Sequence, residues 1–469
     1  MSDKTKYPAL RKISVGKNKI KSKTILSSLV ILITLLGLIL FSGCSFTLDS
    51  LQATFANPTE ITDGNITLNT PTDTAPEAEI TLTAIPQDID EITNQHVLTL
   101  WVPPQFDPNG ETSASALLNN RLDAFISEYP NVEIQVRIKS VSGSGGLLES
   151  LTTTSAAAPD ALPTLILLNR SSLETASLKG LISPLDERST VIDDSDWYGY
   201  ARELAIIQGS VYGLPVAGDA VILVYRPAQF SSTPVDWETL ESLQQPVIFP
   251  VADPEALFTI NLYQSLGGSI QDTQLHPTLD AGLLEIVLQL YENGARSGIF
   301  PTWITQYQSD SQAWQSYLDQ NANAVITWSS RYLSELPADS SAIPVPNLGD
   351  EAYTVADGWM WALADQDPER QVLGIALAEY LVESNFLAEW SPDTGYLPTR
   401  PTSLTAVTNQ NLKTLLSQIV IASHVRPAND LTSTVGPIVQ EAAVQIIKRQ
   451  TNSVEASVAA AEKLETPEE

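Results

Sequence analysis

The chain has 469 residues, a formal net charge of −30, 43% hydrophobic residues and one cysteine. So acidic a protein repels the phosphates of nucleic acids, and we expect no nucleic-acid partner. A single cysteine excludes an intrachain disulfide, and the hydrophobic content is typical of a globular protein rather than a disordered one.

Residues 1–43 have the pattern of an export signal. Lysines and an arginine cluster in residues 4–23, and an uninterrupted stretch of apolar and small residues follows over 25–41. This stretch is just long enough to cross a bilayer, so it could also be kept as a signal anchor. In both cases the basic cluster stays in the cytoplasm, and we expect the rest of the chain to lie outside it.

The pair Ser42-Gly43 directly before Cys44 resembles the lipobox of bacterial lipoproteins, although Phe41 stands where that pattern usually has Leu. The resemblance implies that Cys44 is lipidated and becomes the mature N-terminus. It further implies a protein anchored in the cell membrane by lipid and facing outside the cytoplasm. Residues 44–95 are rich in Thr, Pro, Asp and Asn without a sustained hydrophobic period, which predicts a flexible tether.

The globular part begins with alternating strands and helices. Residues 97–103 have a strand pattern, 117–130 recur at helical spacing, and 131–141 alternate strictly. A glycine-led helix follows from 142, and 163–169 form an apolar strand. Strand, helix, strand, helix, strand predicts a parallel α/β sheet.

A second group of elements follows residue 204. It contains a hairpin at 205–215, a buried strand ending at Arg226, and a helix that starts near Asp236. The stretch from residue 96 onward exceeds one ordinary domain, so we expect two α/β lobes with a second sheet. The expected organisation is a first lobe at 96–218, a second lobe at 219–356, a return to the first lobe with C-terminal helices spanning both at 357–447, and a polar acidic tail at 448–469.

Catalytic signatures are missing from the sequence. The three histidines, His96, His276 and His424, are far apart and lack metal-binding spacing, and there is no GxSxG motif or cysteine nucleophile in the globular part. The glycines of residues 142–150 lack the spacing of a phosphate-binding loop. We therefore expect no enzyme activity, no cofactor and no metal, although a count of carboxylates leaves a glycosidase pair open.

Aromatic residues are placed where strands end or turns begin. In open α/β sheets ligands bind beyond the strand ends, and indole faces suit the apolar faces of sugar rings. A single tryptophan is more often part of the core, but two or more of these residues are expected to line a cleft: Trp101, Tyr225, Trp328, Trp359, Trp361 and Tyr396.

Several segments resemble, in order, the extracellular solute-binding proteins of ABC importers, in the family that includes sugar-binding members. The likeness spans about residues 96–447 and rests on these segments: VLTLW, LNNRLDAFISEYPNVEIQV, PTLILLN, LKGLISPLDE, GSVYGLPVAGDAVILVYRP, PVDWETL, NANAVITWSS, DGWMWAL and TGYLPTRP. Departures are Asp357 where the family often has glycine, and Thr327 before the later aromatic residue.

The resemblance implies a two-lobed, periplasmic-binding-protein-like (type II) α/β fold with an interlobe cleft and hinge crossings. It further implies a monomer that binds a small-molecule solute, most often a sugar, and docks on the transmembrane subunits of an ABC permease. The residues implied to face the cleft are Trp101, Asn169, Arg170, Asp219, Trp328, Trp359 and Tyr396. Two other classes stay open from the sequence: a secreted carbohydrate-active enzyme, and a sensory or adhesive surface protein.

Overall fold

The computed structural model describes residues 95–465. The predicted export signal, Cys44 and all but the last residue of the predicted tether lie outside the described residues, so their predictions stay predictions. The chain divides into two units, Met1–Asp88 and Ile89–Glu469, and every described residue belongs to the second unit. Within 95–465, no helix combines the length and apolarity needed to cross a bilayer.

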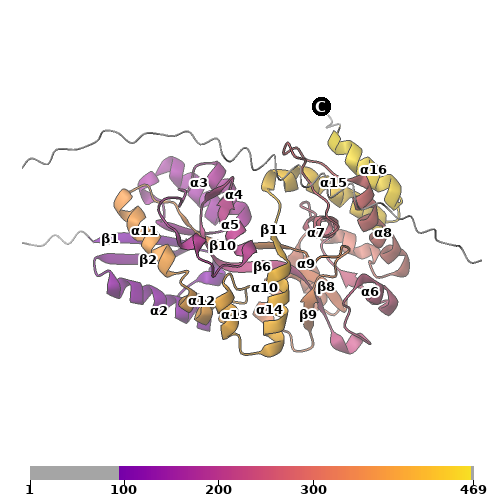
Figure 1. Ribbon diagram of the computed structural model, residues 1–469, viewed down its shortest axis with the longest axis horizontal. Helices are drawn as coiled ribbons and strands as arrows, with labels where there is room; N and C mark the ends of the chain where they lie inside the picture. Colours follow the sequence, from indigo (N-terminus) through magenta and orange to yellow (C-terminus); the bar gives the residue numbers. More distant parts are fainter. Residues whose placement is uncertain (1–94, 466–469) are drawn as a thin grey trace, which may run out of the picture. The chain divides into compact units, whose positions relative to one another are not determined.

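The first lobe is built on three parallel strands, as the sequence predicts. β1 pairs in parallel with both β2 and β3, and helices cover the connections (Figure 1). Thr112 caps α2 by accepting a hydrogen bond from the Ser115 backbone, and Asn169 caps α4 in the same way. The elements are β1 (His96–Val102), α2 (Ser113–Glu128), β2 (Val132–Ile138), α3 (Leu147–Ala157), β3 (Leu165–Asn169) and α4 (Arg170–Leu178).

Two long antiparallel strands carry the chain between the lobes. β6 (Leu214–Tyr225) and β10 (Thr354–Leu363) pair through the middle of the sheet, whose strand order is β2-β1-β3-β10-β6-β8-β7. β9 (Ser341–Pro344) pairs with β6, and β11 (Ser423–Val425) pairs with β10. At about 3.3 Å per residue such strands are long enough to serve both lobes, so one nine-stranded sheet replaces the two sheets we expected.

The second lobe surrounds the far half of β6. Asp236 accepts a hydrogen bond from the Thr239 backbone and starts α6, as predicted. The elements are α6 (Trp237–Leu243), β7 (Val247–Ile248), α7 (Leu257–Ser265), α8 (Ala281–Ser297), α9 (Asp310–Leu318), β8 (Ala324–Trp328), α10 (Ser329–Glu335) and β9 (Ser341–Pro344).

The C-terminal part is helical beyond the predicted boundary. The expected polar tail at 448–469 is wrong for most of its length, because α16 buries Ser453, Ala456 and Ala460 against α8 and α15. The remaining elements are α11 (Pro368–Tyr380), α12 (Ser384–Trp390), α13 (Pro401–Ala406), α14 (Gln410–Ala422), β11 (Ser423–Val425), α15 (Asn429–Ile447) and α16 (Ser453–Glu465).

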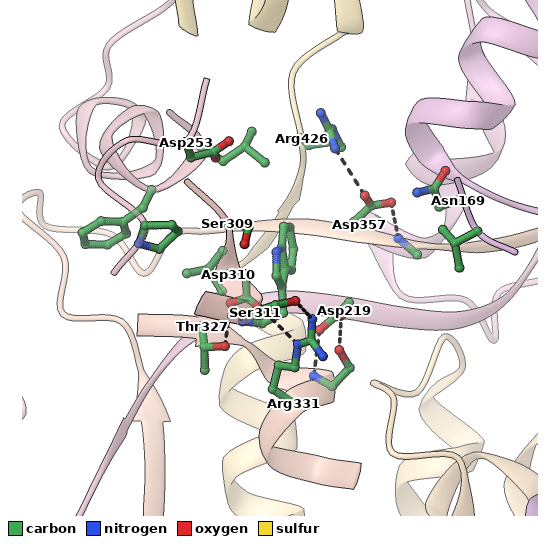
Figure 2. A pocket seen from close by; sticks show the side chains of 18 of the residues that line it. Asn169, Asp219, Asp253, Ser309, Asp310, Ser311, Thr327, Arg331, Asp357 and Arg426 are labelled. Atoms are coloured by element: carbon green, nitrogen blue, oxygen red, sulfur yellow. Dashed lines mark hydrogen bonds and ion pairs between the residues drawn. The ribbon is translucent and has the colours of Figure 1, made fainter. Parts of the chain in front are cut away.

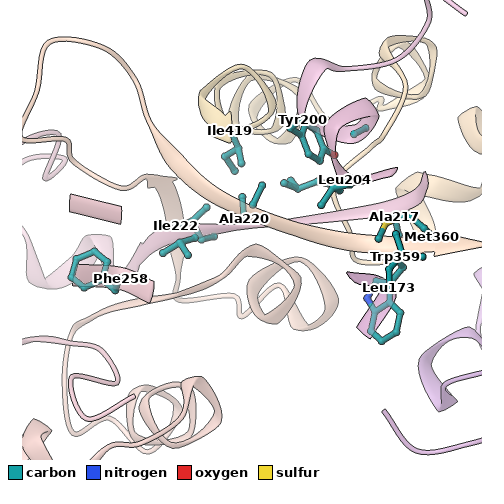
Figure 3. Close-up of a cluster of buried hydrophobic side chains, with 14 of the residues drawn as sticks. Leu173, Tyr200, Leu204, Ala217, Ala220, Ile222, Phe258, Trp359, Met360 and Ile419 are labelled. Atoms are coloured by element: carbon teal, nitrogen blue, oxygen red, sulfur yellow. The ribbon is translucent and has the colours of Figure 1, made fainter. Parts of the chain in front are cut away.

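Helix α5 (Gly199–Ala205) packs directly on the crossing strands, just before the predicted hairpin of β4 (Ile206–Ile207) and β5 (Ser210–Val211). Its Tyr200 and Leu204 lie over the crossing near Ala217 and Ala220 (Figure 3). A Cβ on Gly218 would collide with the Tyr200 ring and its hydroxyl oxygen. Only glycine therefore allows α5 to approach β6 this closely. This contact holds the helix against the crossing strands.

Candidate functional site

A cavity of about 710 Å³ opens where β6 and β10 cross. Its volume is within the range of about 300–1,000 Å³ that is typical of small-molecule sites. Asn169 at the end of β3 lines it from the first lobe, while Asp253, Ser309 and Trp328 line it from the second. Figure 2 shows Asn169 on one side of the cavity and Asp253 and Ser309 on the other.

Five of the seven predicted ligand residues line this one cavity: Asn169, Asp219, Trp328, Trp359 and Tyr396. The strand register explains the convergence. Trp359 of β10 is the direct neighbour of Asn169 on β3, and Trp328 at the end of β8 is the direct neighbour of Val221 on β6. Residues separated widely in sequence therefore meet where the two long strands cross.

Trp101 and Arg170 are not among the lining residues, which corrects the expectation that both face the cleft. Trp101 is 2% exposed within β1, and the Lys139 ammonium nitrogen lies 4.3 Å from its ring centroid. The Arg170 side chain is turned away towards Glu174, 3.7 Å distant, and the Ile206 carbonyl oxygen. From Leu100 to Val102 the strand β1 is buried on both faces, so Trp101 near its end is a core residue here.

Asp219 sits on β6 beneath the start of α10. Its carboxylate accepts hydrogen bonds from the Ser329 hydroxyl at 2.7 Å, the Ser330 backbone at 2.9 Å and the Ser330 hydroxyl at 2.5 Å. Burial raises the pKa of Asp219 to about 6, while the serine donors oppose that rise. No ion pair to Asp219 is present among residues 95–465, so serine hydroxyls and backbone amides alone stabilise its charge.

A second cluster of charged residues borders the cavity on the side of the second lobe. Arg331 donates to Asp310 at 2.9 Å and to the Ser311 hydroxyl at 2.6 Å. Asp310 also accepts from the Thr327 hydroxyl at 2.6 Å, which joins the start of α9 to the end of β8. Sequence reasoning missed this group, because none of its members stands in a recognisable motif.

Arg426 forms the third group, just after β11. Its guanidinium donates to Glu255 of the second lobe at 2.8 Å and lies 3.5 Å from Asp357 on β10. Figure 2 shows the link between Arg426 and Asp357, and Asp357 in turn accepts from the Arg170 backbone at the start of α4, at 3.1 Å. Asp357 is one of the departures noted from the family pattern, and its role is now visible: it joins Arg426 to the first lobe.

The aromatic wall is larger than the sequence indicated. Phe106 is 3% exposed and packs edge-on against Trp359 at 5.6 Å and in a stacked arrangement against Tyr396 at 5.3 Å. Burial raises the pKa of the Tyr396 hydroxyl. Phe106 thus packs against two of the lining rings and restricts their orientation.

The carboxylates are spread along the cavity rather than gathered. Among residues 95–465, no three His, Cys, Asp or Glu side chains are positioned to hold a metal ion. The histidines lie elsewhere: His276 pairs with Asp272 at the surface, and His424 stacks on Tyr353 at 4.3 Å. The arrangement offers hydrogen-bond acceptors and flat apolar faces, a combination suited to a polyhydroxylated ring.

Comparisons with known proteins agree with this description. The family described as bacterial extracellular solute-binding protein matches residues 120–415. A search of curated protein sequences gives no match.

Solved structures share the two-lobed fold. The maltose-binding periplasmic protein MalE from Listeria monocytogenes, in complex with maltose, has a TM-score of 0.65 and 15% identity over 79% of this chain and 97% of that chain. The cyclic alpha-maltosyl-1,6-maltose binding protein from Arthrobacter globiformis has a TM-score of 0.65 and 16% identity over 78% and 97%. Maltose-bound T. maritima MalE3 has a TM-score of 0.62 and 17% identity over 79% and 99%.

Proposed function

The chain belongs to the bacterial extracellular solute-binding protein family, and from that premise we propose that it captures a carbohydrate outside the cytoplasm and delivers it to an ABC permease. The observation that carries the proposal is the cavity at the crossing of β6 and β10. It brings the rings of Trp328, Trp359 and Tyr396 together with Asn169 and Asp219. Rings would contact the apolar faces of the sugar, and the polar groups would bind its hydroxyls.

Binding would act on the arrangement of the two lobes. A solute that touches Asn169 on one side and Ser309 or Trp328 on the other makes its full set of contacts only when both sides are close. The equilibrium would therefore shift towards closure, and β6 and β10 would absorb the hinge motion. The closed monomer would then dock on the transmembrane subunits of the permease.

The N-terminal part of the chain would attach the protein to the cell membrane. Acylation of Cys44 would hold the protein at the outer side of the cell membrane, and the segment 44–95 would give it reach. A single acyl chain anchors weakly, so a diacylglycerol modification is the form that fits the proposal. Membrane extraction of a Cys44→Ser variant tests this: release from the membrane is expected, and full retention would instead support a signal anchor.

The solute proposal is tested on the compact unit Ile89–Glu469. Thermal unfolding is followed against monosaccharides, oligosaccharides, polyols, amino acids and oligopeptides. A ligand at a hundredfold over its Kd stabilises a protein by about 2.7 kcal/mol, which is a measurable shift in Tm. A shift with a sugar and no product formed is expected. A shift only with amino acids or peptides, turnover of a glycan, or silence across the panel would contradict the proposal.

A further inference from the structure

The charges that line the cavity are unequal. Five carboxylates border it, those of Asp219, Asp253, Glu255, Asp310 and Asp357, against the guanidinium groups of two arginines. No lysine or histidine is a lining residue. A wall of this composition holds a net negative charge at neutral pH, in a site partly shielded from water, where charges act more strongly than at the surface.

Both arginines are already occupied. Arg331 is bound to Asp310, and Arg426 is held by Glu255 and Asp357. Their charge is therefore offset inside the protein. A phosphate or carboxylate on a solute would find no free cation among the lining residues and would face the surplus of acidic groups.

Two of the carboxylates have no cationic partner within hydrogen-bond or ion-pair distance among residues 95–465. Asp219 accepts hydrogen bonds from Ser329, from Ser330 and from the backbone of its own strand, and Asp253 accepts from the backbone amides of Glu255 and Leu257. Burial raises the pKa of each of these carboxyl groups, because the hydrogen bonds to them, and for Asp253 the charge of Arg426, offset only part of the cost of burying a negative charge. A positive charge on the solute would offset more of that cost.

The shape of this acidic surface indicates the kind of cation. The carboxylates do not converge on one point, and no metal-holding group exists among residues 95–465. They are distributed over a cavity of about 710 Å³ that also presents aromatic faces. An extended ring compound with an amino substituent matches that distribution, whereas a bare metal ion does not.

Resting on the proposed function, we infer that the cavity selects saccharides that carry a protonated amino group, and excludes saccharides that carry carboxylate or phosphate. An amino group would lie towards Asp253 or towards Asp219, and the sugar rings against Trp328 and Trp359. Neutral saccharides would bind through the rings and hydroxyls alone, with lower affinity.

The test compares the affinities of trisaccharides that have the same β-1,4-linked backbone and differ in charge. Calorimetric titrations of Ile89–Glu469 use cellotriose, its tri-glucosamine counterpart and its tri-glucuronate counterpart, which share the β-1,4 linkage, and maltotriose as an independent neutral sugar. At low salt and pH 7 we expect the amino trimer to bind at least about tenfold more tightly than cellotriose, with the acidic trimer not binding. Salt at about 0.5 M should reduce the preference, because ions screen partly exposed charges.

Two matched variants test whether Asp253 causes the preference for the amino trimer. Asp253→Asn keeps an oxygen that can accept from the Glu255 backbone, and should lower the ratio of amino to neutral affinity about threefold or more. The control Asp319→Asn removes the same charge from an exposed residue that is not among the lining residues, and should leave the ratio unchanged.

The outcomes distinguish the proposed selectivity for amino saccharides from the proposed capture of a carbohydrate. Equal or tighter binding of cellotriose or maltotriose than of the amino trimer would overturn the selectivity and leave carbohydrate capture standing. The same holds for a preference that survives in both Asp253→Asn and Asp219→Asn. Failure of all four saccharides to bind would overturn the selectivity, whereas the proposed function is overturned only by silence across the whole panel of the unfolding screen.

Discussion

Asp219 of β6 and Asp357 of β10 are direct cross-strand partners, and both carboxylates border the cavity. Like charges directly opposite each other destabilise a sheet. The protein offsets them in different ways. Asp219 accepts from the serines that begin α10 in the second lobe, whereas Asp357 binds Arg426 and the start of α4 in the first. The pair thus links the crossing to both lobes.

Removing Arg426 should therefore destabilise the fold. Its side chain is 7% exposed, and Arg426→Met would leave Asp357 and Glu255 without their cation. Breaking such a buried pair by removing one partner costs about 3–5 kcal/mol. Urea unfolding measures the loss. Arg296→Gln is the control, because the pair of Arg296 with Glu292 is exposed and should contribute less than about 1 kcal/mol. Equal losses in the two variants would contradict the assignment.

Gly218→Ala should lower the free energy of unfolding by about 2 kcal/mol or more, because the new Cβ would meet the Tyr200 side chain. Thermal or urea unfolding measures the change. Gly199→Ala is a matched control in α5 itself, since a Cβ there has nothing within 4 Å. The control should be neutral or slightly stabilising, as alanine favours helix more than glycine does. A neutral Gly218→Ala would show that the crossing tolerates displacement of α5.

Asp219 should make stability depend on pH. Its pKa is raised in the folded state to about 6, so its contribution is fully present below about pH 4 and is lost as the pH rises through 6. Asp310 and Asp357 face it as carboxylates, Tyr200 and Tyr396 as phenols, and the nearby Arg331 is paired with Asp310.

Urea unfolding of the wild type and Asp219→Asn at pH 4, 5, 6 and 7 checks this dependence. The stability of the wild type relative to the variant should fall by up to about 3 kcal/mol between pH 4 and 7, since one pKa unit is worth about 1.4 kcal/mol. A difference that stays constant, or grows with pH, would refute the assignment.

Helix α16 should contribute to stability. Ser453 at its start donates to Glu292 and Gln289 of α8, and Ala456 and Ala460 are buried. Deleting Ser453–Glu469 should lower the free energy of unfolding by about 2 kcal/mol or more, as measured in urea. Deletion of 466–469 alone leaves all residues of α16 (Ser453–Glu465) in the chain and should have no effect. Equal stability of the two truncated chains would show that α16 does not stabilise the fold.

Local patterns predicted most elements correctly. The alternation in residues 132–138, the cap at Asp236 and the hairpin before Leu214 depend on neighbours in sequence, and each was found as expected. Alternation was uninformative for β1, because a parallel strand covered on both faces gives no sign of which residue faces a ligand. Trp101 was misplaced for that reason.

Long-range relationships lay beyond the reach of sequence reasoning. The partners of Arg426, Asp357 and Glu255, are 69 and 171 positions away in the chain, and no local sequence pattern predicts either contact. The length of β6 and β10 merged two expected sheets into one. The alanines and serines of α16 are too weakly hydrophobic to mark a packed helix, although alanine is a good helix former among charged residues.

Calorimetric titration of the best saccharide from the unfolding screen into wild type, Trp328→Ala and Trp359→Ala tests most directly whether the solute binds in this cavity. If the sugar is held where β6 and β10 cross, one molecule should bind per chain, and each variant should lose about tenfold or more in affinity, as expected when an aromatic face is removed. Trp303→Ala is the control, because this partly exposed tryptophan is not among the lining residues. Unchanged affinity in both Trp328→Ala and Trp359→Ala would place the solute elsewhere and contradict the central claim.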